Sequence, residues 1–88
     1  MNITSIEDWP ATYLELRNNI LGLNSPRARM DLNKILVGIE TLISELSHEE
    51  VECRRRHTQT PKHRELIVKI NERIEFLEQM TTFGALAT

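Results

Sequence analysis

The sequence contains a single cysteine, so no disulfide can form within the chain to reinforce a small core. One cysteine in 88 residues is also typical of a reducing compartment, and we expect a cytoplasmic protein. Aromatic residues are few, with one Trp, one Tyr and two Phe, so the core must consist mainly of Leu and Ile. A core this thin favours self-association as a further source of stability.

Long apolar runs are also lacking. The longest is ILVGI at 35–39, far shorter than the roughly 20 apolar residues that a helix needs to cross a bilayer. The first ten residues, MNITSIEDWP, have neither the basic start nor the apolar run of a secretory signal. We therefore expect a protein without a signal segment and without contact with a membrane.

Apolar residues recur at alternating intervals of three and four, a pattern typical of helices that pack on other helices. The pattern is present in three segments, which we predict to be helices: 9–23, 26–57 and 61–81. Each predicted start has a capping residue followed closely by proline: Asp8 with Pro10, Ser25 with Pro26, and Thr60 with Pro61. At the first helix Ser5 is a competing cap, with Asp8 at its third helical position.

The predicted fold is all-α: a small three-helix arrangement dominated by a long antiparallel helical hairpin with coiled-coil-like (heptad) packing. One domain is expected over 1–88, with a flexible tail at 82–88 that contains a glycine and small residues. Folding the hairpin about residues 58–60 would place Ile74 near Ile43. Trp9 and Tyr13 follow the helical spacing and are expected in the core, with a partner-binding hot spot as the alternative. Gly38, inside the long helix, costs roughly 1 kcal/mol against Ala unless another backbone approaches it.

Four apolar residues lie off the predicted helix–helix interfaces: Leu14, Leu21, Val68 and Phe76. Scattered exposed apolar residues are common on soluble proteins, so these positions can lack any function. The alternative is that they mark the face of a homodimer or of another protein partner. We favour a homo-oligomer over a monomer, because a middle helix longer than its two neighbours suits a bundle of two chains.

Charge is distributed unevenly along the chain, whose net charge is −2. Residues 53–64 contain five of the 11 Lys and Arg residues and none of the 13 Asp and Glu residues, so the remainder carries 6 cations against 13 anions. Two pairs with the favourable i, i+4 spacing, Glu50–Arg54 and Glu52–Arg56, account for part of this basic cluster. The other basic residues of the segment need a different explanation.

The candidates for binding a partner or an anion are five residues of the predicted turn: Arg55, Arg56, Lys62, His63 and Arg64. Arg55 lacks an obvious partner in the sequence. Residues 62–64 lie in the first turn of a helix, where the dipole disfavours cations and free N–H groups bind anions. The expected ligand is a phosphate or an acidic protein surface. The alternative is that the basic cluster is only a solvated turn.

The same turn contains three side chains of metal-binding type: Cys53, His57 and His63. Cys53 and His57 are spaced i, i+4 on the predicted helix, and thiolate and imidazole are competent zinc ligands. Since paired Cys-x-x-Cys knuckles are absent, we predict no metal and no cofactor, with Cys53 a small hydrophobic residue and the histidines exposed. A catalytic Cys53–His57 pair also lacks a third orienting group and a Gly-rich loop, so we do not expect an enzyme.

These features predict a non-enzymatic protein-binding module, such as an adaptor, a chaperone-like subunit or an inhibitor. It would act through a helix face or the basic turn, and its partner would be another protein or a second copy of the chain. The second interpretation is a nucleic-acid-associated regulator whose residues 54–64 contact phosphates. We rank it second because the chain is net acidic and no aromatic residue lies near the turn for base stacking.

Overall fold

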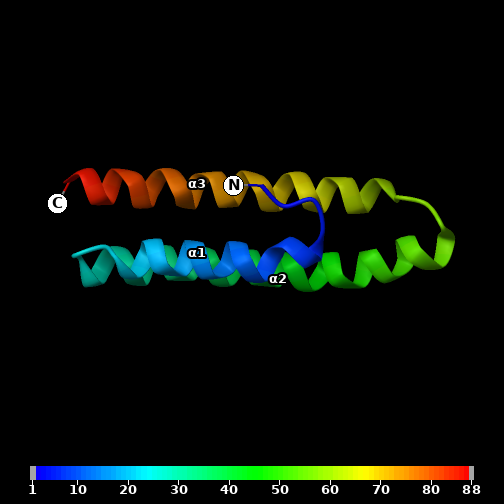
Figure 1. The fold of residues 1–88 in the computed structure, drawn as a ribbon, viewed down its shortest axis with the longest axis horizontal. Coiled ribbons are helices and arrows are strands. Elements are labelled where there is room, and N and C mark those ends of the chain that lie inside the picture. Colours follow the sequence, from blue (N-terminus) through cyan, green and yellow to red (C-terminus); the bar gives the residue numbers. More distant parts are fainter. Residues whose placement is uncertain (1, 88) are drawn as a thin grey trace.

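The computed structural model of the protein describes residues 2–87, and the side chains of residues 2–84. In this part of the chain a 3₁₀ turn is followed by three α-helices: η1 (Ile6–Asp8), α1 (Trp9–Leu21), α2 (Pro26–Arg56) and α3 (Pro61–Ala87). α1 and α3 run antiparallel to α2, and all three pack together into a rod of 49 × 17 × 16 Å (Figure 1). The all-α, three-helix arrangement expected from the sequence is confirmed.

The helices begin where the sequence places capping residues. Ser25 caps α2 by accepting a hydrogen bond from the backbone N–H three residues on, at 3.2 Å. The hydroxyl of Thr60 accepts from the N–H of His63, also at 3.2 Å, in the first turn of α3. Ser5, the competing cap, begins η1 in a capping box with Asp8, whereas Asp8 makes no side-chain cap to α1.

Three helix ends differ from the predicted ones. α1 ends at Leu21 instead of residue 23. α2 ends at Arg56, because His57 adopts the left-handed conformation (φ 55°, ψ 34°) that commonly closes a helix. α3 continues through residues 82–87, which were expected to form a flexible tail, and Thr88 lies outside the described residues. At Gly84 an added Cβ would lie 2.8 Å from the side chain of Leu23, so this part of α3 packs closely against the residues that follow α1.

The core lies between the helices and is aliphatic, as the composition requires. Its members are Ile3, Leu16, Ile20, Leu23, Leu32, Leu36, Ile39, Ile43, Leu46, Leu66, Ile70, Ile74 and Leu77. Trp9 and Tyr13 are partly buried and pack against this cluster, with ring centroids 5.8 Å apart. The core interpretation of these two aromatic residues is therefore supported.

The segment before η1 crosses from the start of α1 to α3, where Ile3 enters the core (Figure 1). The N–H of Ile3 donates to Oδ1 of Asn71 at 2.8 Å, and Nδ2 of Asn71 donates back to the carbonyl of Ile3 at 3.0 Å. Full burial of an isoleucine stabilises the folded state by about 1.5–3 kcal/mol. This anchor was not anticipated, because a single isoleucine outside a helix carries no periodic signal.

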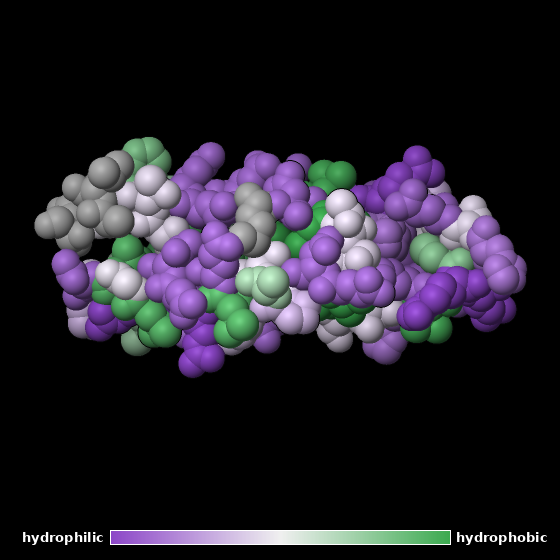
Figure 2. All heavy atoms as spheres, viewed as in Figure 1, coloured by the Kyte–Doolittle hydropathy of each residue, from purple (hydrophilic) through white to green (hydrophobic). Residues whose placement is uncertain are grey.

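Several large apolar side chains remain on the outside, each 45% to 64% exposed: Leu14, Leu21, Met30, Val37, Val51, Val68, Phe76 and Phe83. They include all four residues that lie off the predicted interfaces. Figure 2 shows apolar atoms along the lower edge, where α1 and α2 lie, and along the upper edge, over α3. Within residues 2–87, none of the helices combines the length and the apolar character that a bilayer crossing requires.

Gly38→Ala is expected to raise the free energy of unfolding by about 1 kcal/mol, because alanine has the higher helix propensity. A Cβ at Gly38 would have no neighbouring atom within 4 Å, so the gain meets no steric cost. Urea unfolding followed by circular dichroism measures the change. Gly84→Ala is the matched control, and its gain should be smaller because buried Leu23 must move. A loss of stability in Gly38→Ala would contradict the open surroundings of this residue.

Candidate functional site

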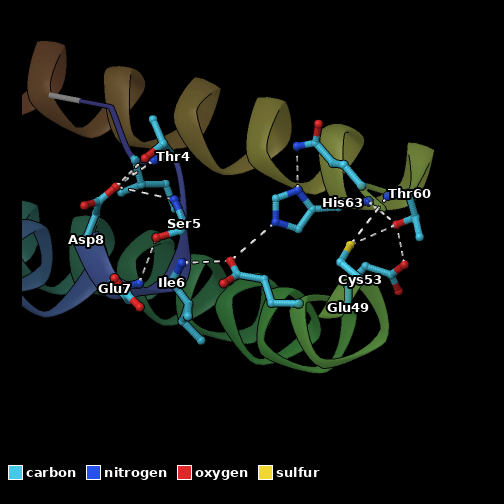
Figure 3. Close-up of polar contacts among 12 residues, drawn as sticks. Thr4, Ser5, Ile6, Glu7, Asp8, Glu49, Cys53, Thr60 and His63 are labelled. Carbon is cyan, nitrogen blue, oxygen red and sulfur yellow. Dashed lines mark hydrogen bonds and ion pairs between the residues drawn. The ribbon is translucent and has the colours of Figure 1, made fainter. Parts of the chain in front are cut away.

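The hairpin tip, defined here as residues 53–64, joins α2 to α3 and is closed by Thr60. The hydroxyl of Thr60 donates to Oε1 of Glu49 at 2.5 Å and accepts from the N–H of His63 (Figure 3). Sγ of Cys53 accepts from the N–H of Thr60 at 3.5 Å and lies 3.7 Å from its hydroxyl oxygen. Thr60 thus ties the last turns of α2 to the first turn of α3.

His63 is buried, with 7% of its surface exposed, so the expectation of an exposed histidine is wrong. Its Nδ1 lies 3.1 Å from Nε2 of Gln59, and its Nε2 lies 3.4 Å from Oε2 of Glu50. Because an amide N–H only donates, we assign Nδ1 as the acceptor and Nε2 as the protonated nitrogen that faces Glu50. Both ring nitrogens are therefore used inside the protein, and neither is free to bind an anion.

Glu50 connects the hairpin tip to the N-terminal segment. Its Oε2 accepts a hydrogen bond from the N–H of Ile6 at 2.8 Å and also faces His63 (Figure 3). The expected pairing of Glu50 with Arg54 is therefore replaced by two contacts with residues far away in the sequence. A carboxylate in this position satisfies a backbone donor and an imidazole donor at once.

Asp8 holds the N-terminal segment in its bent shape. Its carboxylate accepts from the N–H of Thr4 at 2.8 Å, from the Thr4 hydroxyl at 2.9 Å and from the N–H of Ser5 at 3.3 Å. These hydrogen bonds, those from Thr4 first, lower the pKa of Asp8 below its ordinary value because they favour the charged carboxylate. The bend directs the N–H of Ile6 towards Glu50 (Figure 3).

Arg55 and Arg56 both pair with Glu52. Nη2 of Arg55 contacts Oε1 of Glu52, and Nε of Arg55 lies 3.3 Å from Oε2. Nε of Arg56 lies 3.0 Å from Oε1, so the Glu52–Arg56 pair expected from the i, i+4 spacing is confirmed. The expectation that Arg55 lacks a partner is wrong. Hydrogen bonds from Arg55 and then from Arg56 lower the pKa of Glu52.

Three exposed cations of the hairpin tip have no carboxylate partner in the part of the chain that the structure describes: Arg54, Lys62 and Arg64. Lys62 and Arg64 were among the sequence-based candidates, whereas Arg54 was expected to pair with Glu50. The hairpin tip therefore has fewer unpaired cations than the sequence suggests. One of them, Arg54, was not among the predicted binding residues.

Cys53 lies in the last turn of α2, whereas His57 follows the helix and closes it in the left-handed conformation, with its N–H turned back to the Arg54 carbonyl. Sγ of Cys53 faces Thr60 instead (Figure 3). Among residues 2–87, no group of three His, Cys, Asp or Glu side chains is placed to hold a metal ion.

An open pocket of about 390 Å³ lies where the N-terminal segment meets the hairpin tip. It is lined by Ile6, Glu7, Glu50, Cys53, Arg54, Thr58, Gln59 and His63. Most of its polar side chains are engaged with one another or with the backbone, as Glu50 is with Ile6 and His63. Arg54 is the lining cation whose charge is not neutralised by a carboxylate of the described chain.

No protein-family model, curated protein or solved structure matches the chain. Candidate functions therefore rest on the side chains themselves. Sequence reasoning missed the contact between Glu50 and His63, although a signal was available. Both residues continue the three-and-four spacing of the buried positions, Glu50 after Leu46 and His63 before Leu66.

Glu50→Ala is expected to lower the free energy of unfolding by about 1–3 kcal/mol, because it leaves two partly buried donors without an acceptor. Those donors are the N–H of Ile6 and Nε2 of His63. Urea unfolding measures the loss, and faster amide exchange at Ile6 would show that the N-terminal segment has been released. Glu45→Ala, at an exposed position of α2, is the control and should change stability by no more than about 0.5 kcal/mol. Equal effects of the two substitutions would refute the role given to Glu50.

Proposed function

We propose that the protein is a non-enzymatic protein-binding module, such as an adaptor, a chaperone-like subunit or an inhibitor, which binds through the outer face of α3. One observation carries the proposal: both phenylalanines of the chain are exposed on this face. Phe76 is 45% exposed and Phe83 is 64% exposed, and Val68 lies on the same side of α3 at 56%. A chain so poor in aromatic residues leaves its two largest purely apolar side chains outside the core.

The spacing along α3 fits recognition by a helix. Phe76 and Phe83 are seven residues apart, close to two full turns, so they lie in one row along the helix. Val68 is exposed on the same side of α3, about 80° around the helix axis from Phe76. Rows of this kind bind in the apolar grooves of partner proteins, and aromatic side chains dominate the energy of such contacts. Glu72 and Gln79 lie between the apolar residues and supply a polar margin.

The proposal includes the absence of catalysis and of a cofactor, because the reactive side chains of the hairpin tip have structural partners. Cys53 contacts Thr60, and His63 contacts Glu50 and Gln59. We also propose a cytoplasmic location and coiled-coil packing of α2 on α3, both of which the sequence suggests. Matched rows of buried Leu and Ile on the two helices support the latter.

Affinity capture from a native lysate of the source cells is expected to recover a stoichiometric protein partner with the wild-type chain. Val68→Ser with Phe76→Ser should reduce recovery at least about tenfold, because the loss of two apolar anchors removes well over 1.4 kcal/mol of binding free energy. Val51→Ser, at an equally exposed position of α2, should leave recovery unchanged. Circular dichroism verifies that each variant is folded.

Two results would contradict this assignment. Unchanged recovery by the Val68→Ser, Phe76→Ser variant would remove the outer face of α3 from the binding surface. Repeated capture of no stoichiometric protein by the wild-type chain would reject the protein-binding module as a whole.

A second candidate function, a nucleic-acid-associated regulator, is favoured by the free cations of the hairpin tip. Arg54, Lys62 and Arg64 are exposed, come from the end of α2 and the start of α3, and lack carboxylate partners in the described structure. Each cation that neutralises a phosphate releases a counterion, which makes such binding strongly dependent on salt. The net acidic charge of the chain opposes this function, which is why it ranks second.

Fluorescence anisotropy with generic DNA and RNA at low salt tests the second candidate. Replacing Arg54, Lys62 and Arg64 by alanine should reduce the slope of log affinity against log salt by about one for each cation. Glu52→Gln should strengthen binding, because it releases Arg55 and Arg56 from their shared carboxylate. Absence of binding by the wild-type chain at low salt, or equal binding by the triple variant, would eliminate nucleic acid as the partner.

A further inference from the structure

The outer side of the α1–α2 pair carries two adjoining hollows of about 340 and 300 Å³. Both are lined by Met30 and Asn33, so together they form one continuous depression, named here the α1–α2 groove. Three of the exposed apolar side chains line it: Leu21 from α1, and Met30 and Val37 from α2, which are 58%, 62% and 59% exposed. The groove therefore offers an apolar floor that residues 2–84 leave exposed.

The charged residues that line the α1–α2 groove have one sign. They are Arg17, Arg29 and Lys34, and its described lining includes no carboxylate. Nη1 of Arg29 donates to the Leu23 carbonyl, which holds that side chain at the end of the groove. Arg17 and Lys34 have no ionic partner among the described residues. An apolar groove with a cationic margin suits an apolar helix face that carries carboxylates.

The same chain presents such a helix face, named here the α3 ridge. It consists of the exposed apolar residues Val68, Phe76 and Phe83 with the exposed acidic residues Glu65, Glu72 and Glu75. Lys69 and Arg64 lie at its margin, where both line a hollow together with Glu65 and Val68. Three carboxylates against these two cations leave the ridge with a net negative charge. The ridge thus has the apolar row and the sign of charge that the α1–α2 groove requires.

The ridge and the groove lie on opposite sides of the rod. α3 forms the upper layer in Figure 1, while α1 and α2 pack on each other in the lower layer. Apolar atoms appear along both of these edges in Figure 2. The ridge of a molecule therefore cannot reach its own groove, whereas it can reach the groove of a neighbour.

We propose that the α1–α2 groove of one molecule receives the α3 ridge of a second copy. The proposal rests on the proposed function, in which the outer face of α3 binds protein, and it names the occupant of that face. Because groove and ridge are different surfaces on opposite sides, the contact is heterologous and adds molecules in an open row. It does not close a two-fold dimer, so assembly grows with protein concentration.

Sedimentation velocity at low salt over a range of concentrations tests the contact with the full chain. The wild-type protein should shift from the monomer mass of 10.3 kDa to larger species as its concentration rises. A groove variant, Arg17→Glu with Lys34→Glu, and a ridge variant, Glu72→Lys with Glu75→Lys, should each raise the concentration of half-association at least about tenfold, since like charges then face each other. Arg29 is left in place because it bonds to the Leu23 carbonyl.

An equimolar mixture of the groove and ridge variants is expected to restore association, because the reversed groove then meets a reversed ridge. Glu7→Lys with Glu15→Lys is the matched control for the ridge variant, with the same change in net charge at exposed positions outside both surfaces. This control should associate like the wild-type chain. A wild-type chain that stays monomeric at every concentration, or a mixture that fails to associate, would overturn the proposal.

The outcome also separates this proposal from the proposed function. A monomeric wild-type chain that captures a different protein through Val68 and Phe76 would reject the second copy as occupant and leave the protein-binding module intact. A chain that neither self-associates nor captures a partner would reject both.

Discussion

The register of α2 on α3 is the constraint on which the rest of the molecule depends. Two polar contacts set it, one between Cys53 and Thr60 and one between Glu50 and His63. Because the two helices are antiparallel, moving three or four residues towards the start of α2 corresponds to moving the same number of residues towards the end of α3. Continued in this way, the register aligns the buried residues of both helices: Ile43 with Ile70, Ile39 with Ile74, Leu36 with Leu77, and Leu32 with Thr81. A slip of one turn would break the tip contacts and misalign the core together.

The spacing of apolar residues was sufficient to predict three helices and their starts, because burial against a neighbour requires a row on one side. It was not sufficient to predict the register. Folding about residues 58–60 placed Ile74 near Ile43, whereas the contacts of the tip place Ile70 there, one turn away. The difference arises at His57, which closes α2 in a left-handed conformation. Glycine is the usual residue in this conformation, so a histidine here gives no signal in the sequence that the helix ends. A shift of this kind leaves every residue on its predicted side of the helix, so the pattern alone cannot reveal it.

The candidate site was predictable only where partners are close in sequence. The Glu52–Arg56 pair follows directly from i, i+4 spacing, since neighbouring turns of one helix always bring such residues together. The contacts of Glu50 with Ile6 and of Ile3 with Asn71 join residues 44 and 68 positions apart. The periodicity of apolar residues identifies the side of a helix that faces inward. It does not show which backbone group, distant in the sequence, will contact that side.

The placement of apolar residues links the stability of this protein to its proposed function. α1 and the N-terminal segment cover one side of the α2–α3 hairpin, and aliphatic side chains fill the space between them. Both phenylalanines could enlarge that core, yet they lie outside it on α3, where exposure of apolar surface to water is unfavourable. A thin core with its largest apolar side chains on the surface gains stability whenever that surface is covered. Under the proposed function, a partner for the outer face of α3 would supply burial that the isolated chain lacks.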